Sequence, residues 1–253
     1  MFSDSDFMRY SRQLLLEEFG LDGQQKLQAA SVLIIGLGGL GSPAALYLAA
    51  AGVGKLVLAD DDQVHISNLQ RQILFRSTET GQSKVAQAKK HLRDLNPQVE
   101  FIALERRMTS ETLHETVQWV DLVLDCSDNM ETRHAVNAAC VSHAKPLISA
   151  SAVGFGGQLL VLTPPFAHGC YRCLWPDEAE PQRNCRTAGV LGPVVGVMGT
   201  LQALEALKML AGLPSSLAGK LRLFDGRQQT WRTLTLERSA GCQVCGGSHE
   251  IAC

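Results

Sequence analysis

The sequence predicts an α/β fold in which a Rossmann-like, mostly parallel sheet is covered by helices and continues into an antiparallel C-terminal extension. Three observations support this prediction. Short apolar runs alternate with helical segments over the first two-thirds of the chain, a run of glycines follows the first apolar run, and this alternation then stops. Strands buried on both faces of a parallel sheet have this continuous apolar character.

The parallel part is expected to begin with a strand at Val32–Ile35, a helix of small residues at Gly41–Ala51 and a strand at Lys55–Ala59. Downstream, Asn96-Pro97 breaks the chain between a helix and the next strand. The remaining expected elements are a helix at Ser83–Leu95, strands at Val99–Leu104 and Leu122–Asp125, a helix at Met130–Ala144 and a strand at Pro146–Ala150.

The antiparallel extension is predicted from strands at Gly157–Leu162, Leu221–Phe224 and Trp231–Leu236. Between them, Pro176–Arg186 is polar and without periodicity, which predicts a mobile loop. Val190–Met209 is a long, largely uncharged segment, and we expect a buried helix there. A subunit interface is one place where such a helix is buried.

The composition excludes some classes of function. The 253 residues are 45% hydrophobic and 19% charged, with a net charge of −2, so there is no electrostatic footprint for nucleic acid or an anionic membrane. The acidic N-terminus does not resemble a signal peptide. Val32–Gly54 carries no charge, but its six glycines and Pro43 divide it into strand, loop and helix, so we reject a membrane span. We expect a cytoplasmic protein.

The glycine run Gly36-Leu37-Gly38-Gly39-Leu40-Gly41 lies between the first strand and the first helix. This arrangement directs backbone N–H groups and a helix N-terminus at a bound phosphate. Asp60 follows 19 residues after Gly41, at the end of the second strand, where an acid binds the ribose of NAD or ATP. We interpret its neighbours Asp61 and Asp62 as solvated loop residues.

The next segment favours ATP over a nicotinamide cofactor. It reads Ser67-Asn68-Leu69-Gln70-Arg71-Gln72 and is followed by Lys84. A triphosphate requires Arg and Lys side chains for its charge, whereas a nicotinamide enzyme needs no such pair beside its glycine loop. The alternative is that Arg71 and Lys84 are ordinary surface charges.

Asp125-Cys126-Ser127-Asp128-Asn129 follows another strand, at the edge where open α/β sheets bind ligands. Asp128 is a candidate ligand for Mg²⁺, which proteins bind through one or two carboxylates together with phosphate oxygens. We interpret Asp125 as a buried acid that caps the following turn.

Four of the eight cysteines form two Cys-x-x-Cys pairs, and they predict a closed, structural Zn²⁺ site. His168 is the rival ligand, and a pair of redox dithiols is the competing interpretation. Cys126 and Cys140 are expected to be packed thiols. The zinc ligands are Cys170, Cys173, Cys242 and Cys245.

Cys185 lies in the polar loop, and Arg183 and Arg186 flank it. Nearby cations favour the thiolate, which makes this cysteine a candidate nucleophile. A free surface cysteine without a role is the alternative.

Taken together, these motifs resemble the ThiF/MoeB/HesA family of the ubiquitin-activating-enzyme superfamily. The resemblance covers Phe7 to Gly247, and Arg9–Gln13, Cys170–Pro176 and Asn184–Thr187 are most similar to the members of thiamin synthesis. The motifs are the glycine run, Asp60, Ser67–Arg71, Lys84, Asp125–Asn129 and the two Cys-x-x-Cys pairs.

The resemblance implies an adenylyltransferase of a ubiquitin-like sulfur-carrier protein that ends in Gly-Gly. It implies a homodimer in which Arg12 reaches the partner's site, and a role for Cys185 in an acyl-persulfide link during sulfur transfer, with a cysteine desulfurase or sulfurtransferase as sulfur donor. The catalytic residues expected are Arg12, Arg71, Lys84, Asp128 and Cys185. The residues expected to bind ATP and Mg²⁺ are Gly36, Gly38, Gly39, Gly41, Asp60, Ser67, Asn68, Leu69, Gln70, Arg71, Lys84, Asp128 and Asn129.

On this view the chain is a single domain, residues 1–253, with a nucleotide-binding part of about 1–150 and a carrier, loop and zinc part of about 151–250. Three alternatives stay open. The carrier can be that of molybdopterin synthesis. A NAD-dependent oxidoreductase explains Gly36–Gly41 and Asp60 but leaves Arg71, Lys84 and the cysteine pairs without a role. A non-catalytic scaffold is expected to have lost the nucleotide residues, which are present here.

Overall fold

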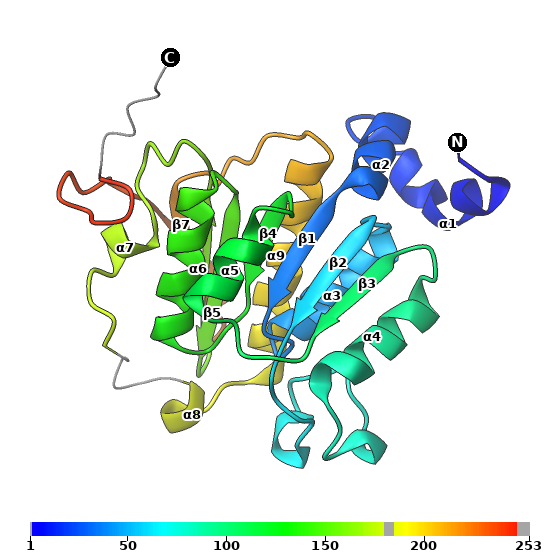
Figure 1. Ribbon diagram of the computed structural model, residues 1–253, viewed down its shortest axis with the longest axis horizontal. Coiled ribbons are helices and arrows are strands. Elements are labelled where there is room, and N and C mark those ends of the chain that lie inside the picture. The colour runs from blue at the N-terminus through cyan, green and yellow to red at the C-terminus, as the bar shows by residue number, and fades with distance from the viewer. Residues whose placement is uncertain (1, 180–184, 247–253) are drawn as a thin grey trace.

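A sheet of eight strands forms the centre of the molecule in the computed structural model, which describes residues 2–179 and 185–246 (Figure 1). Its order is β3-β2-β1-β4-β5-β6-β7-β8; the pairs from β3 to β5 are parallel and those from β5 to β8 antiparallel. The strands are β1 Ser31–Ile35, β2 Lys55–Ala59, β3 Glu100–Leu104, β4 Leu122–Asp125, β5 Leu147–Val153, β6 Gly156–Leu162, β7 Lys220–Asp225 and β8 Thr230–Thr235. The predicted fold class is confirmed.

Helices cover both faces of the sheet and bury two hydrophobic clusters. One cluster packs α3, α4 and α9 against the sheet, and the other packs α5 and α6 against the opposite face (Figure 1). The helices are α1 Asp4–Leu14, α2 Gly20–Ala29, α3 Gly41–Ala51, α4 Lys84–Leu95, α5 Ser110–Val117, α6 Met130–Ser142, α7 Tyr171–Leu174, α8 Cys185–Ala188 and α9 Gly192–Leu210, with 3₁₀ turns η1 Ile66–Asn68 and η2 Ser77–Glu79. None of the described helices has the length and apolar character that crossing a membrane requires.

Three boundaries differ from the sequence prediction for identifiable reasons. Helix α9 begins at Gly192 because Val190 forms a bridge with Gly154 in the turn after β5. Helix α6 ends at Ser142, and Ala144 beyond it has a positive φ, which stops the helix. Within the loop predicted for Pro176–Arg186, Cys185 and Arg186 begin α8, while residues 180–184 lie outside the described part of the chain.

The apolar helix α9 is buried mainly within its own chain, against α3, β5 and β6. Its close approach to the preceding elements depends on glycine: a Cβ on Gly199 would overlap the carbonyl oxygen of Leu40. Val197 and Leu204 remain exposed on its outer face. A subunit interface is therefore not the main site of its burial.

Candidate active site

The glycine loop joins β1 to α3 and cannot accept side chains at two of its positions. Gly36 has a φ of +88°, and a Cβ there would lie 2.8 Å from the carbonyl oxygen of Cys126. A Cβ on Gly41 would overlap the carbonyl oxygen of Gly36. The loop therefore folds tightly enough for α3 to begin at Gly41, with its first N–H groups near the carboxyl end of β1.

Asp60 fixes this loop from the end of β2. Its Oδ2 accepts a hydrogen bond of 2.7 Å from the backbone N–H of Leu37, and its Oδ1 accepts one of 2.9 Å from the N–H of Asp62. Burial raises the pKa of Asp60, and the nearby Lys84 ammonium opposes that rise. The carboxylate thus holds the loop while it lies in the site.

Lys84 is a buried cation at the first position of α4. Its Nζ lies 3.0 Å from Oδ2 of Asp62, and only 4% of its side chain is exposed. The idea of an ordinary surface lysine is therefore wrong. The side chain of Asp62 is 72% exposed, as expected for a solvated loop residue, and it also pairs with Lys84. Arg71 is partly buried, and its guanidinium donates to the carbonyl of Ser67 at 3.2 Å and to Oδ1 of Asn68 at 3.3 Å.

The turn after β4 is fixed by its own side chains. Asp125 is buried and accepts hydrogen bonds from Ser127 Oγ at 2.6 Å and Ser149 Oγ at 2.7 Å, which confirms the predicted capping role. Asn129 caps α6, because its Oδ1 accepts a hydrogen bond of 2.9 Å from the N–H of Thr132. Asp128 lies between these two, exposed at the carboxyl edge of the sheet.

These segments surround one cavity of about 930 Å³ at the carboxyl ends of the parallel strands. Its size and position are those of a nucleotide site in an open α/β sheet. The predicted residues that line it are Gly36, Gly38, Gly39, Asp60, Ser67, Asn68, Arg71, Lys84, Asp128 and Asn129.

Four predicted residues do not line the cavity. Gly41 is buried at the start of α3, and Leu69 packs against the hydrophobic cluster of α3, α4 and α9. Gln70 is exposed, and its carbonyl lies so close to Gly192 of α9 that a Cβ there would be 2.5 Å away. Arg12 is exposed in the last turn of α1.

The cavity also contains residues that the sequence analysis did not assign to the site. Gln72 is buried, and its Oε1 has no hydrogen-bond partner among the described residues. Arg106 and Arg107 lie two and three residues after the end of β3 and line the same cavity, as does Trp175 after α7. The rule that ligands bind at the carboxyl ends of parallel strands, applied to β3, would have identified the two arginines.

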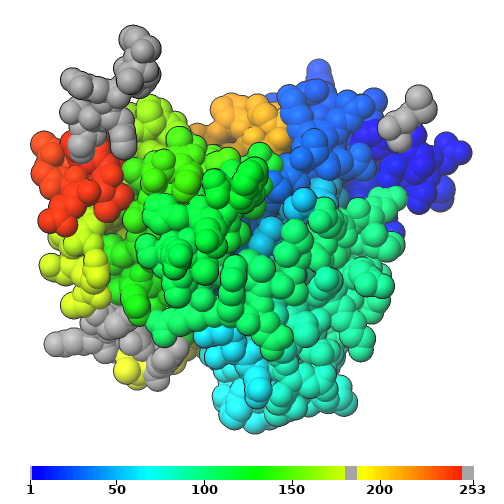
Figure 2. All heavy atoms as spheres, viewed as in Figure 1, coloured from blue at the N-terminus to red at the C-terminus, as the bar shows by residue number. Residues whose placement is uncertain are grey.

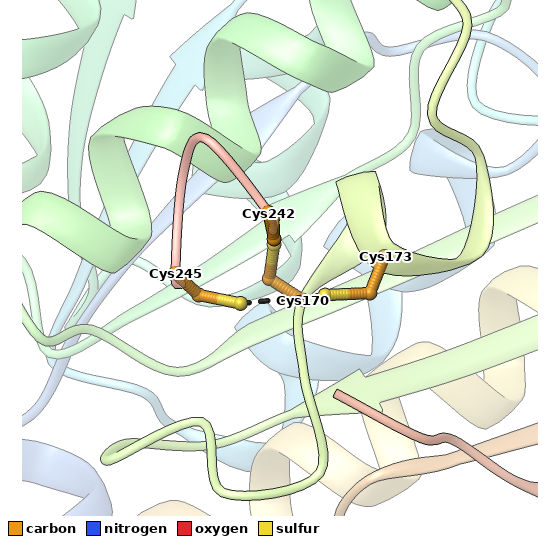
Figure 3. A group of neighbouring side chains, drawn as sticks. All are labelled: Cys170, Cys173, Cys242 and Cys245. Atoms are coloured by element: carbon orange, nitrogen blue, oxygen red, sulfur yellow. Dashed lines mark hydrogen bonds between the residues drawn. The ribbon is translucent and has the colours of Figure 1, made fainter. Parts of the chain in front are cut away.

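The four paired cysteines gather around one point, although 72 residues separate the two pairs along the chain (Figure 3). All four Sγ atoms lie within 4.8 Å of one another, with 3.8 Å between Cys170 and Cys242 and 3.4 Å between Cys173 and Cys245. A tetrahedron of thiolates with Zn–S bonds of about 2.3 Å has edges of about 3.8 Å, so the geometry fits zinc. His168 is not part of this cluster.

The cluster joins the segment that contains Cys242 and Cys245 to the start of α7. In Figure 2 this segment (red) lies beside the yellow-green part of the chain. Asn137 of α6 donates to Cys170 Sγ at 3.4 Å, and the N–H of Ser239 donates to Cys173 Sγ at 3.4 Å. Such hydrogen bonds stabilise thiolate ligands.

The other cysteines differ from one another. Cys126, just after β4, and Cys140, in α6, are buried, and burial raises the pKa of each thiol, as expected for packed side chains. The side chain of Cys185 lies outside the described part of the structure, although its backbone begins α8. Val190, five residues further on, lines the cavity.

Comparisons with known proteins are consistent with this site. The model of the ThiF family matches residues 10–244. The chain is 64% identical to the sulfur carrier protein ThiS adenylyltransferase of Escherichia coli K12, over 98% of both proteins. It is 49% identical to the adenylyltransferase and sulfurtransferase MOCS3 of Sus scrofa, covering 96% of this chain but 54% of that protein. Among solved structures, E. coli MccB with ATP matches with a TM-score of 0.81 and 27% identity, over 94% of this chain and 73% of that one.

Proposed function

The chain belongs to the ThiF family, and we propose that it catalyses the ATP-dependent adenylation of the C-terminal carboxylate of a ThiS-like, ubiquitin-like sulfur-carrier protein in thiamin biosynthesis. The observation that carries this proposal is the single cavity in which the glycine loop, Asp60, Arg71 and Lys84 meet. The 64% identity to a ThiS adenylyltransferase over nearly the whole of both chains supports the choice of carrier.

The reaction joins two anions. An oxygen of the carrier's terminal carboxylate bonds to the α-phosphorus of ATP, the bond from that phosphorus to the bridging oxygen breaks, and pyrophosphate leaves. Arg71 and Lys84 offset the negative charge, and the N–H groups of the glycine loop orient the phosphates. The attacking carboxylate is ionised at neutral pH, so the step needs no general base.

Asp128 would hold the Mg²⁺ that accompanies ATP, because it is a carboxylate exposed at the cavity's edge. The bound ion would neutralise phosphate charge. Asn129 contributes through the cap that shapes this turn. Asp60 binds the ribose, as acids do at the end of the second strand of such folds.

Arg12 serves the site of a partner subunit in a homodimer. Two observations support this: Arg12 is exposed and does not line the cavity of its own chain, and apolar side chains are exposed on α1, α3 and α9. Those side chains are Phe7, Met8, Tyr47, Val197 and Leu204. Apolar surface of this kind favours association with a second copy.

Cys170, Cys173, Cys242 and Cys245 hold Zn²⁺ in a structural role, because four thiolates leave no open coordination position. The described cysteines form no disulfide, which fits a reducing compartment, and we place the protein in the cytoplasm. Cys185 acts after adenylation. As a persulfide charged by a cysteine desulfurase or sulfurtransferase, its outer sulfur would attack the acyl-adenylate and displace AMP, and a thiol reductant would then cleave the S–S bond of the resulting acyl-persulfide link and release the thiocarboxylate.

Mass spectrometry of the carrier tests the proposal. With ATP and Mg²⁺, a purified thiamin carrier should gain the mass of one adenylyl group (AMP less one water), and the same carrier without its last glycine should gain none. A gain of mass on the molybdopterin carrier alone would show that the carrier of molybdopterin synthesis, and not that of thiamin synthesis, is the substrate. If neither carrier gains AMP while the protein binds NADH, the oxidoreductase alternative is favoured.

A further inference from the structure

We propose that Asp62 is a positioning residue for adenylation: its carboxylate holds the Lys84 ammonium at the nucleotide cavity. This inference rests on the proposed function. Asp62 is not one of the residues expected to contact ATP, yet it is the ion-pair partner of a cation that is. Three features of the structure point to this role.

The first feature is a double attachment between the two residues. The Nζ of Lys84 lies 3.0 Å from Oδ2 of Asp62, and the backbone N–H of Lys84 donates to the carbonyl of Asp62, also at 3.0 Å. Between these contacts, Gln63 and Ser83 form an antiparallel bridge. Both the backbone and the side chain of Lys84 are therefore fixed relative to the loop after β2.

The second feature is that Lys84 lies at a position where a lysine lowers the stability of the fold. It is the first residue of α4, where the helix dipole disfavours a cation, and its side chain is buried. A buried ammonium without an opposite charge is costly. Catalysis rather than stability therefore explains a lysine at this position, and its ammonium group needs a nearby carboxylate to hold it in place.

The third feature is the competing acid. Lys84 acts electrostatically on Asp60, whose two oxygens already accept hydrogen bonds from Leu37 and Asp62. Without the Asp62 carboxylate, the ammonium would turn toward Asp60. That movement would shift the Lys84 ammonium away from the position in which it stabilises the transition state.

The charge of Asp62 gives the inference a distinctive signature. A carboxylate beside a triphosphate repels it, so simple electrostatics predicts that Asp62→Asn binds ATP at least as tightly as the unchanged protein. Loss of positioning predicts instead that kcat falls, because a misplaced cation no longer stabilises the transition state. We expect both effects together: a lower kcat with an unchanged or smaller KM for ATP.

The test is carrier-dependent ATP–pyrophosphate exchange with three variants of the full chain. Asp62→Asn should lower kcat by about 10- to 100-fold, with a KM for ATP no higher than that of the unchanged protein. Asp62→Glu should recover most of the rate, because it restores the charge. Asp61→Asn is the matched control: Asp61 is an exposed neighbour on the same cavity, and no described residue forms an ion pair with it, so its kcat should stay within about twofold.

A double-mutant cycle shows whether Asp62 acts through Lys84. In a Lys84→Met background, Asp62→Asn should cause little further loss of kcat. The Tm of each variant shows whether the substitution unfolds the protein. Calorimetry without turnover gives the dissociation constant for ATP independently of kcat.

An equal loss of kcat in both backgrounds would overturn the inference, as would a raised KM with unchanged kcat, or a kcat for Asp62→Asn equal to that for Asp61→Asn. A large fall in the Tm of Asp62→Asn that Asp62→Glu does not reverse would assign the residue to folding instead. Absence of exchange in the unchanged protein would overturn the proposed function and this inference with it.

Discussion

The backbone N–H of Leu37 donates a hydrogen bond of 2.7 Å to Oδ2 of Asp60, which joins the glycine loop to the end of β2. One carboxylate thereby fixes the loop that is expected to bind phosphate and lies where ribose is expected. The phosphate and ribose subsites are coupled through this bond, so changes at Asp60 should affect both stability and nucleotide affinity.

Asp60→Asn should gain stability relative to the unchanged protein as the pH rises from about 4 to neutral, and it should weaken ATP binding. Burial raises the pKa of Asp60 above its ordinary value of 3.8, so the native state binds this proton more tightly than the unfolded chain does. The ionised carboxylate therefore lowers the free energy of unfolding once the pH has risen through the raised pKa, and this cost is absent below the ordinary value.

An Asn keeps an acceptor for the N–H of Leu37 and carries no charge, but its NH2 group would face the N–H of Asp62, a cost that does not change with pH. The Tm of Asp60→Asn relative to that of the unchanged protein should therefore be higher between about pH 7 and 8 than at about pH 4. A difference in Tm that is constant across this range would show that the pH-dependent loss of stability does not come from Asp60.

Gly41→Ala should destabilise the protein by several kcal/mol, roughly 2–4, because the new Cβ would overlap the carbonyl oxygen of Gly36 and force the glycine loop apart. Gly196→Ala, in α9, is the matched control, since nothing lies within 4 Å of its Cβ position. Removing a helical glycine there should stabilise by about 0.5–1 kcal/mol. Urea unfolding measures both, and similar changes in the two variants would contradict the steric account.

Cys173→Ser should reduce bound zinc from about one ion per chain to well below one and lower the Tm, because the site would lose a thiolate. Cys140→Ala removes a buried cysteine outside the cluster and should leave the zinc content unchanged. Metal analysis of the purified proteins measures the zinc content of both variants. Full zinc occupancy in Cys173→Ser would show that this cysteine is not a ligand.

Cys185→Ala should retain carrier-dependent pyrophosphate exchange and lose sulfur transfer, because its proposed link forms after adenylation. Mass spectrometry of the carrier follows the transfer as conversion of the terminal carboxylate to a thiocarboxylate. Cys126→Ala, at a buried thiol beside Gln202, controls for loss of any cysteine near the site. Loss of exchange in Cys185→Ala would instead place the residue in the first step.

Arg12→Ala and Arg71→Ala should complement each other when co-expressed, since a mixed dimer has one site with an intact Arg71 and the partner's intact Arg12. Random pairing would restore about a quarter of the sites, because about half of the dimers are mixed and each has one complete site. Exchange assays on the two separate variants and on the co-expressed mixture measure this. No recovery in the mixture would contradict a role in trans.

Elements with a strong local pattern could be predicted closely. The strands β1, β2 and β4 are mainly apolar runs, and β2 and β4 have the predicted boundaries. The sequence does not predict helices α2 and α5. Helix α2 buries only one large apolar side chain, Leu27. Helix α5 buries only Leu113 and Val117, and the capping box at Thr109 lacks the acidic residue that usually indicates a helix start. Short helices of this kind become stable through packing.

The candidate site could be predicted where motifs lie at strand ends, as for Gly36, Asp60 and Asp128. Contacts between distant segments could not. The pairing of Asp62 with Lys84 joins residues 22 positions apart, and Gly192 meets Gln70 across 122 positions. Such pairs depend on how α4 and α9 pack against the loop after β2, which no local pattern encodes.

ATP–pyrophosphate exchange with a purified thiamin carrier tests the central claim most directly. The account predicts exchange that requires the carrier's terminal glycine and falls by at least about 100-fold in Arg71→Ala, since that guanidinium lines the cavity in which the two anions meet. Exchange that proceeds without any carrier, or that Arg71→Ala leaves unchanged, would contradict it.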